Sequence, residues 1–272
     1  MIDLHTHILP GVDDGVQRVE DALLMAEDAA EQGVTLMVAT PHLFWGERNA
    51  LSVAQIREGV AQLNALIEAK GIPLKVLPGC EIPLSADLLA RLERGEWMPL
   101  GGETRTVLVE PPWHEWHAWS AEVLHSLIES GWTVVLAHPE RHSIFQRNLA
   151  LLEELVAMNV HLQATASSLI PGRSSPKTAR CAYDLLERQL VSVVASDCHD
   201  VTGRRCDMRE AYQTLQRAFG QRIAKMLTTT VPQALLRGEK VDLAQIWQKG
   251  ATDESRWKRF LRAVLRRETD DG

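Results

Sequence analysis

The feature that most constrains the fold is an alternation of short apolar runs with longer stretches of helical spacing. Seven runs are mostly rich in Val, Leu or Ile, at residues 2–5, 34–40, 74–79, 106–110, 133–137, 161–164 and 191–196. Such runs are typical of parallel strands buried on both faces. Helical patterns lie between them, for example at 22–32, 53–69, 118–130, 149–158 and 179–188. The alternation predicts a parallel α/β sheet, either open and doubly wound or closed into a barrel.

Side chains of metal-binding type follow nearly every predicted strand. They are His5, His7, His42, Glu81, Glu110, His138, Asp197 and His199. The strand ends of a closed barrel converge on one mouth, whereas an open sheet would spread them along a line. We therefore expect a parallel barrel of seven β/α units, TIM-like, with its site at the C-terminal ends of the strands. We assign residues 1–240 to this barrel and 241–272 to a C-terminal helical extension.

The spacing of these residues predicts a cluster of ions. His5 and His7 are two positions apart, so in an extended segment both imidazoles can reach one ion, and Asp197 and His199 repeat this spacing. Asp13 or Asp14 adds a carboxylate from the first loop, and spacing alone does not separate the two. Nine candidate ligands are too many for one tetrahedral zinc and suffice for two or three ions. Imidazole with carboxylate suits zinc, manganese or iron.

Charge indicates the chemistry of this cluster. Three divalent ions bring about +6 and four carboxylates about −4, so the centre keeps roughly +2 and attracts an anion such as a phosphoryl group. Arg141 lies three residues after His138, and Arg204 lies five after His199. Guanidinium forks match phosphate oxygens. The sequence therefore predicts a metal-dependent phosphoester hydrolase, in which Arg141 and Arg204 either hold the phosphate or are ordinary surface charge.

Composition narrows the class of partner. The net charge of −7 argues against a nucleic-acid partner. The four cysteines form no paired motif and indicate reduced thiols in a cytoplasmic protein. No signal peptide and no spanning helix are expected. Residues 257–267 form a basic helix with one apolar face, predicted to rest on a membrane surface, dock a partner or pack on its own barrel or on a neighbouring subunit.

Two loops are predicted at the same face as the metal cluster. The tryptophan-rich loop 111–119 offers Trp113, whose ring would contact a substrate or pack within the loop. The loop 167–177 would contact a substrate or serve only as a connection.

Three blocks carry a resemblance to a known family. Residues 2–15 (IDLHTHILPGVDDG), 138–141 (HPER) and 195–199 (ASDCH) resemble bacterial capsular-polysaccharide-type tyrosine-protein phosphatases. These are the CpsB/CapC-like branch of the polymerase and histidinol phosphatase superfamily. The order of the blocks is kept from residue 1 to about 235. The resemblance implies a distorted barrel with three divalent ions, manganese first, with iron or zinc as alternatives.

The same resemblance implies roles for single residues. His5, His7, Glu81 and Asp197 would hold one ion; Glu81, Glu110 and His138 a second; Asp14, His42 and His199 the third. Arg141 and Arg204 match the positions that grip the phosphate. The implied substrate is a phosphotyrosine protein, in particular an autophosphorylating bacterial tyrosine kinase that regulates capsular or exopolysaccharide biosynthesis. Alternatives are a small-molecule phosphatase of the histidinol-phosphate type, a nucleic-acid phosphodiesterase, an amidohydrolase or a non-catalytic binding module. The oligomeric state stays open.

Overall fold

Eight parallel strands form the centre of the molecule. The computed structural model describes residues 1–43, 51–113 and 115–247. Its strands are β1 (Ile2–Thr6), β2 (Leu36–Ala39), β3 (Lys75–Pro78), β4 (Glu81–Pro83), β5 (Thr106–Glu110), β6 (Thr133–Ala137), β7 (His161–Thr165) and β8 (Val191–Ala195). The seven predicted strands are confirmed, and β4 is an eighth that the sequence analysis did not separate.

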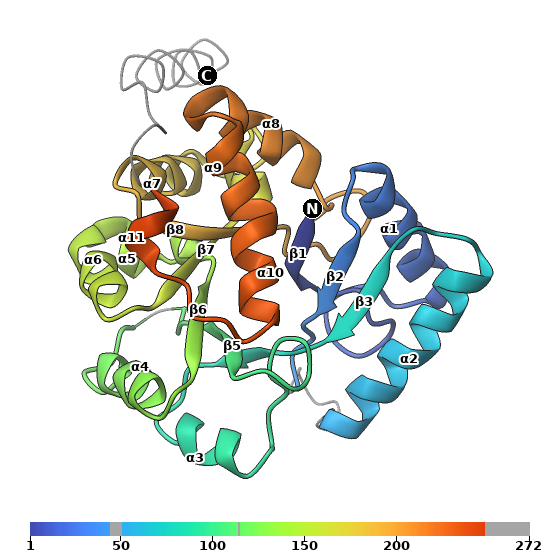
Figure 1. Cartoon of the computed structure of the whole chain (residues 1–272), viewed down its shortest axis with the longest axis horizontal. Coiled ribbons are helices and arrows are strands. Elements are labelled where there is room, and N and C mark those ends of the chain that lie inside the picture. The colour runs from blue at the N-terminus through green and yellow to red at the C-terminus, as the bar shows by residue number, and fades with distance from the viewer. Residues whose placement is uncertain (44–50, 114, 248–272) are drawn as a thin grey trace.

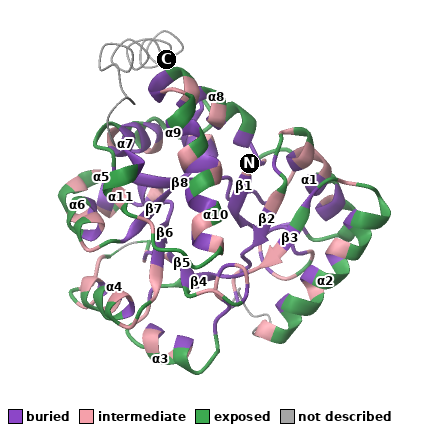
Figure 2. Ribbon diagram, viewed as in Figure 1, coloured by how far each residue is buried: buried purple, intermediate pink, exposed green. Residues whose placement is uncertain are grey.

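Helices surround these strands (Figure 1). They are α1 (Val19–Glu31), α2 (Val53–Ala69), α3 (Leu88–Glu93), α4 (Ser120–Glu129), α5 (Ser143–Arg147), α6 (Leu149–Ala157), α7 (Pro176–Glu187), α8 (Met208–Phe219), α9 (Gln221–Lys225), α10 (Val231–Leu236) and α11 (Leu243–Ile246). Figure 2 shows buried strands inside helices whose outer faces are exposed. The apolar faces of the helices therefore pack on the strands, as their periodicity predicts.

The strands form two sheets that meet edge to edge. β1, β2 and β3 make the first sheet, and β4 to β8 make the second, with parallel pairing throughout. Single bridges join them: Thr6 pairs with Cys198, and His42 pairs with Glu81. Within the described residues no continuous ladder closes the ring. The parallel α/β prediction is confirmed, but the closed barrel is not.

The break between the two sheets falls between β3 and β4. Pro78 ends β3 and has no N–H to continue the ladder. A Cβ on Gly79 would lie 2.8 Å from Val38 Cγ1, so the chain passes too close to β2 there for any side chain. The strand resumes at Glu81 in the second sheet. Glu81 therefore begins a new strand instead of following the third one.

The C-terminal segment covers the amino ends of the strands. Thr106, the first residue of β5, donates a hydrogen bond from Oγ1 to the Leu235 carbonyl at 3.0 Å. Trp247 donates from Nε1 to the carbonyl of Val191, the first residue of β8, at 2.9 Å. The opposite, carboxyl ends of the strands are therefore left to form a site.

Two predictions concern the outside of the molecule. The basic helix predicted at 257–267 lies outside the described residues. No helix among the residues that are described is long and apolar enough to cross a membrane.

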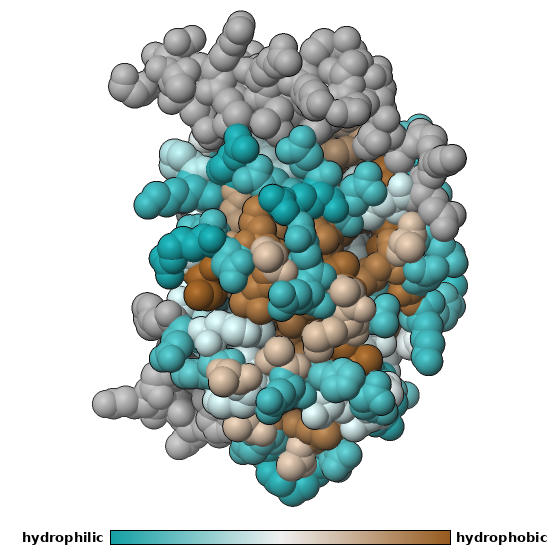
Figure 3. All heavy atoms as spheres, turned by 90° about the vertical axis from the view of Figure 1, so that its left-hand side faces the viewer, coloured by the Kyte–Doolittle hydropathy of each residue, from teal (hydrophilic) through white to brown (hydrophobic). Residues whose placement is uncertain are grey.

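Figure 3 shows one face of the molecular surface, on which hydrophilic side chains are interspersed with hydrophobic ones.

Candidate metal centre

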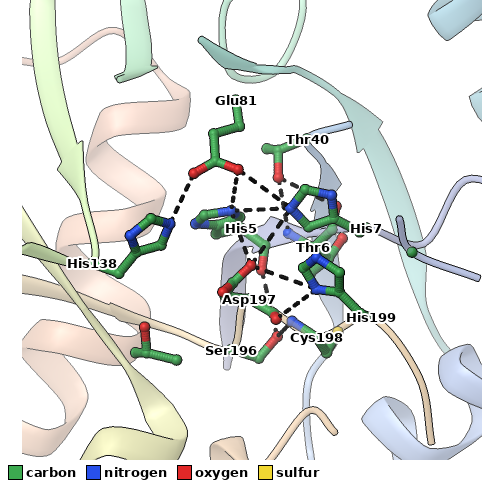
Figure 4. A network of polar contacts seen from close by, with 12 residues as sticks. His5, Thr6, His7, Thr40, Glu81, His138, Ser196, Asp197, Cys198 and His199 are labelled. Atoms are coloured by element: carbon green, nitrogen blue, oxygen red, sulfur yellow. Dashed lines mark hydrogen bonds and ion pairs between the residues drawn. The ribbon is translucent and has the colours of Figure 1, made fainter. Parts of the chain in front are cut away.

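Two histidines and two carboxylates bring their ligand atoms to one point. His5 Nε2 lies 3.2 Å from Glu81 Oε2 and 3.3 Å from Asp197 Oδ1. His7 Nε2 lies 3.4 and 3.5 Å from the same two oxygens, and 3.3 Å from His5 Nε2. A tetrahedral ion with ligands at about 2.0–2.1 Å separates those ligands by roughly 3.3–3.4 Å. The three atoms of His5, His7 and Glu81 therefore have the spacing of ligands to one ion, with Asp197 Oδ1 beside both imidazoles, and Figure 4 shows these side chains converging.

Local backbone geometry directs the ligands inward. His5 lies on β1 and His7 directly after it, so their side chains share one face. Asp197 has φ 53° and His138 has φ 32°, in the left-handed region that non-glycine residues rarely adopt. The N–H of Asp197 donates to the His5 carbonyl at 2.9 Å, which fixes this turn against β1. Residues held in this region cluster at functional sites.

Glu81 also contacts a second group of side chains. Glu81 Oε1 lies 2.9 Å from His138 Nε2, and Oε2 lies 3.5 Å from His42 Nε2. Ligand atoms of His42, Glu81 and Glu110 lie within 4.8 Å of one another. Burial, followed by the neighbouring charge of Glu81, raises the pKa of Glu110 to about 8. Two carboxylates so close together call for a cation between them.

A third group forms around Asp14. Asp14 Oδ2 lies 3.3 Å from His199 Nε2, and Oδ1 lies 3.9 Å from His42 Nε2. Burial acts to raise the pKa of Asp14, but the hydrogen bond and charge of His199 outweigh it and hold this pKa at about 2. Ligand atoms of His7, Asp14 and His199 lie within 4.8 Å of one another. Asp14 is therefore ionised and faces the cluster.

Asp13 has a different position from its neighbour. Its Oδ2 accepts from His7 Nδ1 at 2.7 Å and from the His42 N–H at 3.0 Å. Its Oδ1 accepts from the Gly15 N–H at 2.9 Å. Asp13 thus orients His7 from behind, whereas Asp14 Oδ1 is buried and accepts no hydrogen bond from the described residues. The placement favours Asp14 over Asp13 as the ligand.

Two supporting residues escaped the sequence analysis. Gln163 Oε1 accepts from His5 Nδ1 at 3.0 Å and from the His138 N–H at 3.3 Å. Asp3 Oδ1 accepts from the Ser196 N–H at 2.9 Å, and burial raises the pKa of Asp3 to about 6. A lone polar residue on an apolar strand was the only available signal. By accepting from Nδ1, Gln163 fixes the tautomer that leaves His5 Nε2 free for a metal.

The donor set fits borderline divalent ions. Imidazole nitrogens and carboxylate oxygens make up all three groups, a set that suits zinc, manganese or iron. The thiols are not part of it: all four cysteines are free and buried, and burial raises the pKa of Cys80 and Cys198. These thiols therefore stay neutral beside the ligands.

The cluster opens into a cavity of about 430 Å³. Arg141 and Arg204 line it, and both guanidinium groups contact Asp197 Oδ2, that of Arg204 at 2.6 Å. The Trp113 ring, 44% exposed, stacks on His142 with centroids 4.3 Å apart and lies 5.6 Å from the Arg141 guanidinium. The cavity therefore places the metal ligands, the two arginines and an aromatic wall together.

Known proteins are similar to this one over most of the chain. The family model described as "Capsular polysaccharide synthesis, CpsB/CapC" matches residues 1–237. The tyrosine-protein phosphatase YwqE of Bacillus subtilis is 34% identical over 241 residues, covering 89% of this chain and 93% of that protein. The tyrosine-protein phosphatase CpsB of Streptococcus pneumoniae is 29% identical over 250 residues, covering 89% of this chain and 100% of that protein.

A solved structure agrees with these sequence matches. One chain from the crystal structures of YwqE and CpsB, described there as unique metal-dependent tyrosine phosphatases, superposes with a TM-score of 0.84 at 34% identity. The match covers 89% of this chain and 96% of that one. The chain therefore belongs to the CpsB/CapC capsular polysaccharide synthesis family.

Proposed function

We propose that this protein is a metal-dependent protein-tyrosine phosphatase, that is, a phosphoric monoester hydrolase. The observation that carries the proposal is the convergence of His5, His7, Glu81 and Asp197 beside a cavity walled by Arg141 and Arg204. Relatives that match over nearly the whole chain are named tyrosine-protein phosphatases. The proposal thus combines a metal-type cluster, phosphate-type arginines and family membership.

We further propose that the centre holds three divalent ions, manganese first and iron or zinc as alternatives. The first would lie among His5, His7, Glu81 and Asp197; the second among Glu81, Glu110 and His138; the third among Asp14, His42 and His199. When bound, such ions supply Lewis acidity toward phosphoryl oxygens and lower the pKa of water toward neutrality. The two oxygens of Glu81 face different histidines, which supports its role as a bridge.

The remaining chemistry belongs to the side chains of the cavity. The Arg141 and Arg204 guanidinium groups would leave Asp197 Oδ2 to grip the phosphoryl oxygens in a bidentate way. Trp113 would support the tyrosine ring from the cavity wall. The phenolate leaving group has a pKa near 10, so it departs with little help from an acid. No side chain of the described residues therefore needs to act as a dedicated general acid.

The finer assignments follow from the family. We infer that the substrate is a phosphotyrosine protein, in particular a bacterial tyrosine autokinase that regulates capsular or exopolysaccharide biosynthesis, and that the protein acts in the cytoplasm. We also infer that the two sheets, bridged at Thr6–Cys198 and His42–Glu81, form a strongly distorted barrel of the polymerase and histidinol phosphatase type.

A rate comparison tests the function. Metal-loaded protein should hydrolyse a phosphotyrosine peptide with a much higher kcat/KM than histidinol phosphate. Arg141→Ala and Arg204→Ala should each lower kcat/KM by about tenfold to a hundredfold, because each removes charge-assisted hydrogen bonds to the phosphoryl group. Arg237→Ala, which removes an arginine with a 61% exposed side chain, is the matched control.

Metal content must be measured on the same samples. If both arginine variants keep their ions and their full rate, the phosphate clamp is wrong. Faster turnover of histidinol phosphate would replace the protein substrate by a small molecule.

A further inference from the structure

A second cavity adjoins the metal cavity. It has a volume of about 310 Å³, and its wall shares Trp113, Arg141, Asp197 and Arg204 with the larger one. Its far side comes from the loop before α7 and from the loop after β8. Nothing in the proposed hydrolysis of a single phosphoryl group uses this space.

The far side of the cavity carries two more arginines. Arg173 donates to Asp207 Oδ2 from Nη2 at 2.7 Å and from Nε at 3.1 Å. Arg205 donates from Nη2 to Asp207 Oδ1 at 3.1 Å. Both arginines line the cavity, and their guanidinium groups share this single carboxylate. The arrangement repeats that of Arg141 and Arg204, which share Asp197.

Arginines outnumber carboxylates on the wall of the cavity. Its lining includes Arg141, Arg173, Arg204 and Arg205. Behind this wall Arg204 also lies 3.6 Å from Asp14 Oδ2, Asp207 pairs with Arg173 and Arg205, and the buried Glu140 accepts from the Thr165 N–H and from Ser168 Oγ. Asp197 is the one carboxylate among the described residues that line the cavity. Its other oxygen, Oδ1, faces the histidines of the metal cluster. The lining therefore presents more arginines than carboxylates to a ligand, which favours an anion.

Hydroxyl groups without partners point to the kind of anion. Thr165 is only 4% exposed, and its Oγ1 has no hydrogen-bond partner among the described residues. Ser174 Oγ and Arg205 Nε are likewise buried donors without a partner in that part of the chain. All three residues line the cavity. A buried donor left unpaired costs about 1–3 kcal/mol, so an acceptor supplied by a ligand fits here.

The helix α7 adds a further attraction. Ser175 caps its N-terminus by accepting from the Thr178 N–H at 3.2 Å, and Ser175 and Thr178 both line the cavity. The N-terminus of a twelve-residue helix carries a partial positive charge that favours anions. Arginines, unpaired hydroxyl groups and a helix N-terminus therefore meet at one place.

We propose that this second cavity binds a second anionic group of the substrate while the phosphotyrosine occupies the metal cavity. The inference rests on the proposed phosphatase function and names its substrate class: phosphotyrosine peptides with an acidic group close by in the chain. That group is an oxyanion, either a second phosphoryl group or an Asp or Glu carboxylate. The shared wall of Arg141 and Arg204 lets one extended peptide reach both cavities.

The test uses three phosphotyrosine peptides that differ only at one flanking residue. This residue is glutamine, glutamate or phosphoserine, placed at several positions on either side. Dephosphorylation of the tyrosine is followed by its phenol absorbance. Wild-type protein should show a kcat/KM about tenfold or more higher for an anionic peptide than for the glutamine peptide. A higher ratio for phosphoserine than for glutamate identifies phosphoryl as the source, and equal ratios identify any oxyanion.

Variants test whether the cavity causes the higher kcat/KM for anionic peptides. Arg173→Gln and Arg205→Gln should bring the anionic-to-neutral ratio to within about twofold of one, and Thr165→Val, which removes only the hydroxyl, should lower it several-fold. Arg180→Gln is the matched control, because Arg180 lies on α7, pairs with Asp184 and does not line the cavity. Its ratio should equal that of the wild type.

The outcomes separate the two proposals. Equal rates of wild-type protein on all three peptides would overturn the inference and leave the phosphatase function standing. Variants that slow every peptide equally, with an unchanged ratio, would also overturn it, since the arginines would then be structural. If an arginine variant does not fold, as judged by its melting temperature, Thr165→Val still decides. Absence of turnover with any phosphotyrosine peptide would remove both proposals together.

Discussion

Replacing Gln163 by leucine should weaken the metal centre without touching a ligand. Gln163 Oε1 accepts hydrogen bonds from His5 Nδ1 at 3.0 Å and from the His138 N–H at 3.3 Å. Leucine accepts neither, so His5 loses the partner that fixes its tautomer and its ring orientation. Loss of such outer partners typically lowers metal affinity by about 10–100-fold, or roughly 1.4–2.7 kcal/mol. We expect a loss in this range for the ion held by His5.

The assay is a metal titration of the stripped protein by calorimetry, with ion content measured after dialysis. Gln163→Glu is the control, since its carboxylate keeps both acceptor contacts and makes His5 a stronger ligand. The Leu variant should bind more weakly, and the Glu variant at least as tightly as wild type. Near-UV circular dichroism should show both variants folded. Equal affinity of the Leu variant and wild type would refute the reasoning that Gln163 positions the ligand.

Three further predictions follow from the same structure. With metals removed, the contribution of Glu110 to the free energy of unfolding should fall by about 3 kcal/mol as pH rises from about 5 to about 8, because Glu110 keeps its proton up to its folded pKa of about 8 but loses it near its usual value when unfolded. Urea denaturation of wild type and of Glu110→Gln across this range isolates this contribution from that of the buried His142 and His161, whose lowered pKa values act in the opposite direction; a difference between the two proteins that does not change with pH would contradict it. Asp14→Asn should remove about one ion per chain by elemental analysis, whereas Asp13→Asn should keep the ion count and lower affinity about tenfold; the reverse pattern would exchange their roles. Gly79→Ala should destabilise the fold by about 1–3 kcal/mol in urea, since its Cβ would meet Val38 Cγ1 at 2.8 Å, and an unchanged midpoint would count against this close approach.

The strands could be predicted because burial on both faces leaves a continuous apolar run in the sequence. The break between β3 and β4 could not be predicted. Pro78 and Gly79 interrupt the apolar run at only two positions, which is also typical of the end of a single strand. Glu81 was therefore predicted at the end of the third strand, whereas it begins β4. Closure of the ring depends on how the edges of the two sheets pair, and the hydrophobic pattern of each single strand does not determine that pairing.

The convergence of the candidate ligands could be predicted because they recur at the ends of strands, where topology brings them together. Asp13 and Asp14 could not be separated, because only the positions of His7 and His199 in space distinguish them. Gln163 was missed because a single glutamine on a strand has no motif. For the loop 167–177, the sequence did not decide between contact with a substrate and a plain connection. Arg173 in this loop becomes a candidate for anion binding only because the fold places it beside Arg205.

The position of the metal cluster across the break between the sheets has a mechanical consequence. His5 and His7 come from the first sheet, and Glu81 and Asp197 come from the second; among the described residues, only single bridges join the two sheets. Ions bound by these four side chains would link the two sheets where their edges meet. After chelation, the amide hydrogens around Thr6, His42 and Glu81 should exchange before those of the other strands. The proposed metal centre would then also be the place where the two sheets separate most easily.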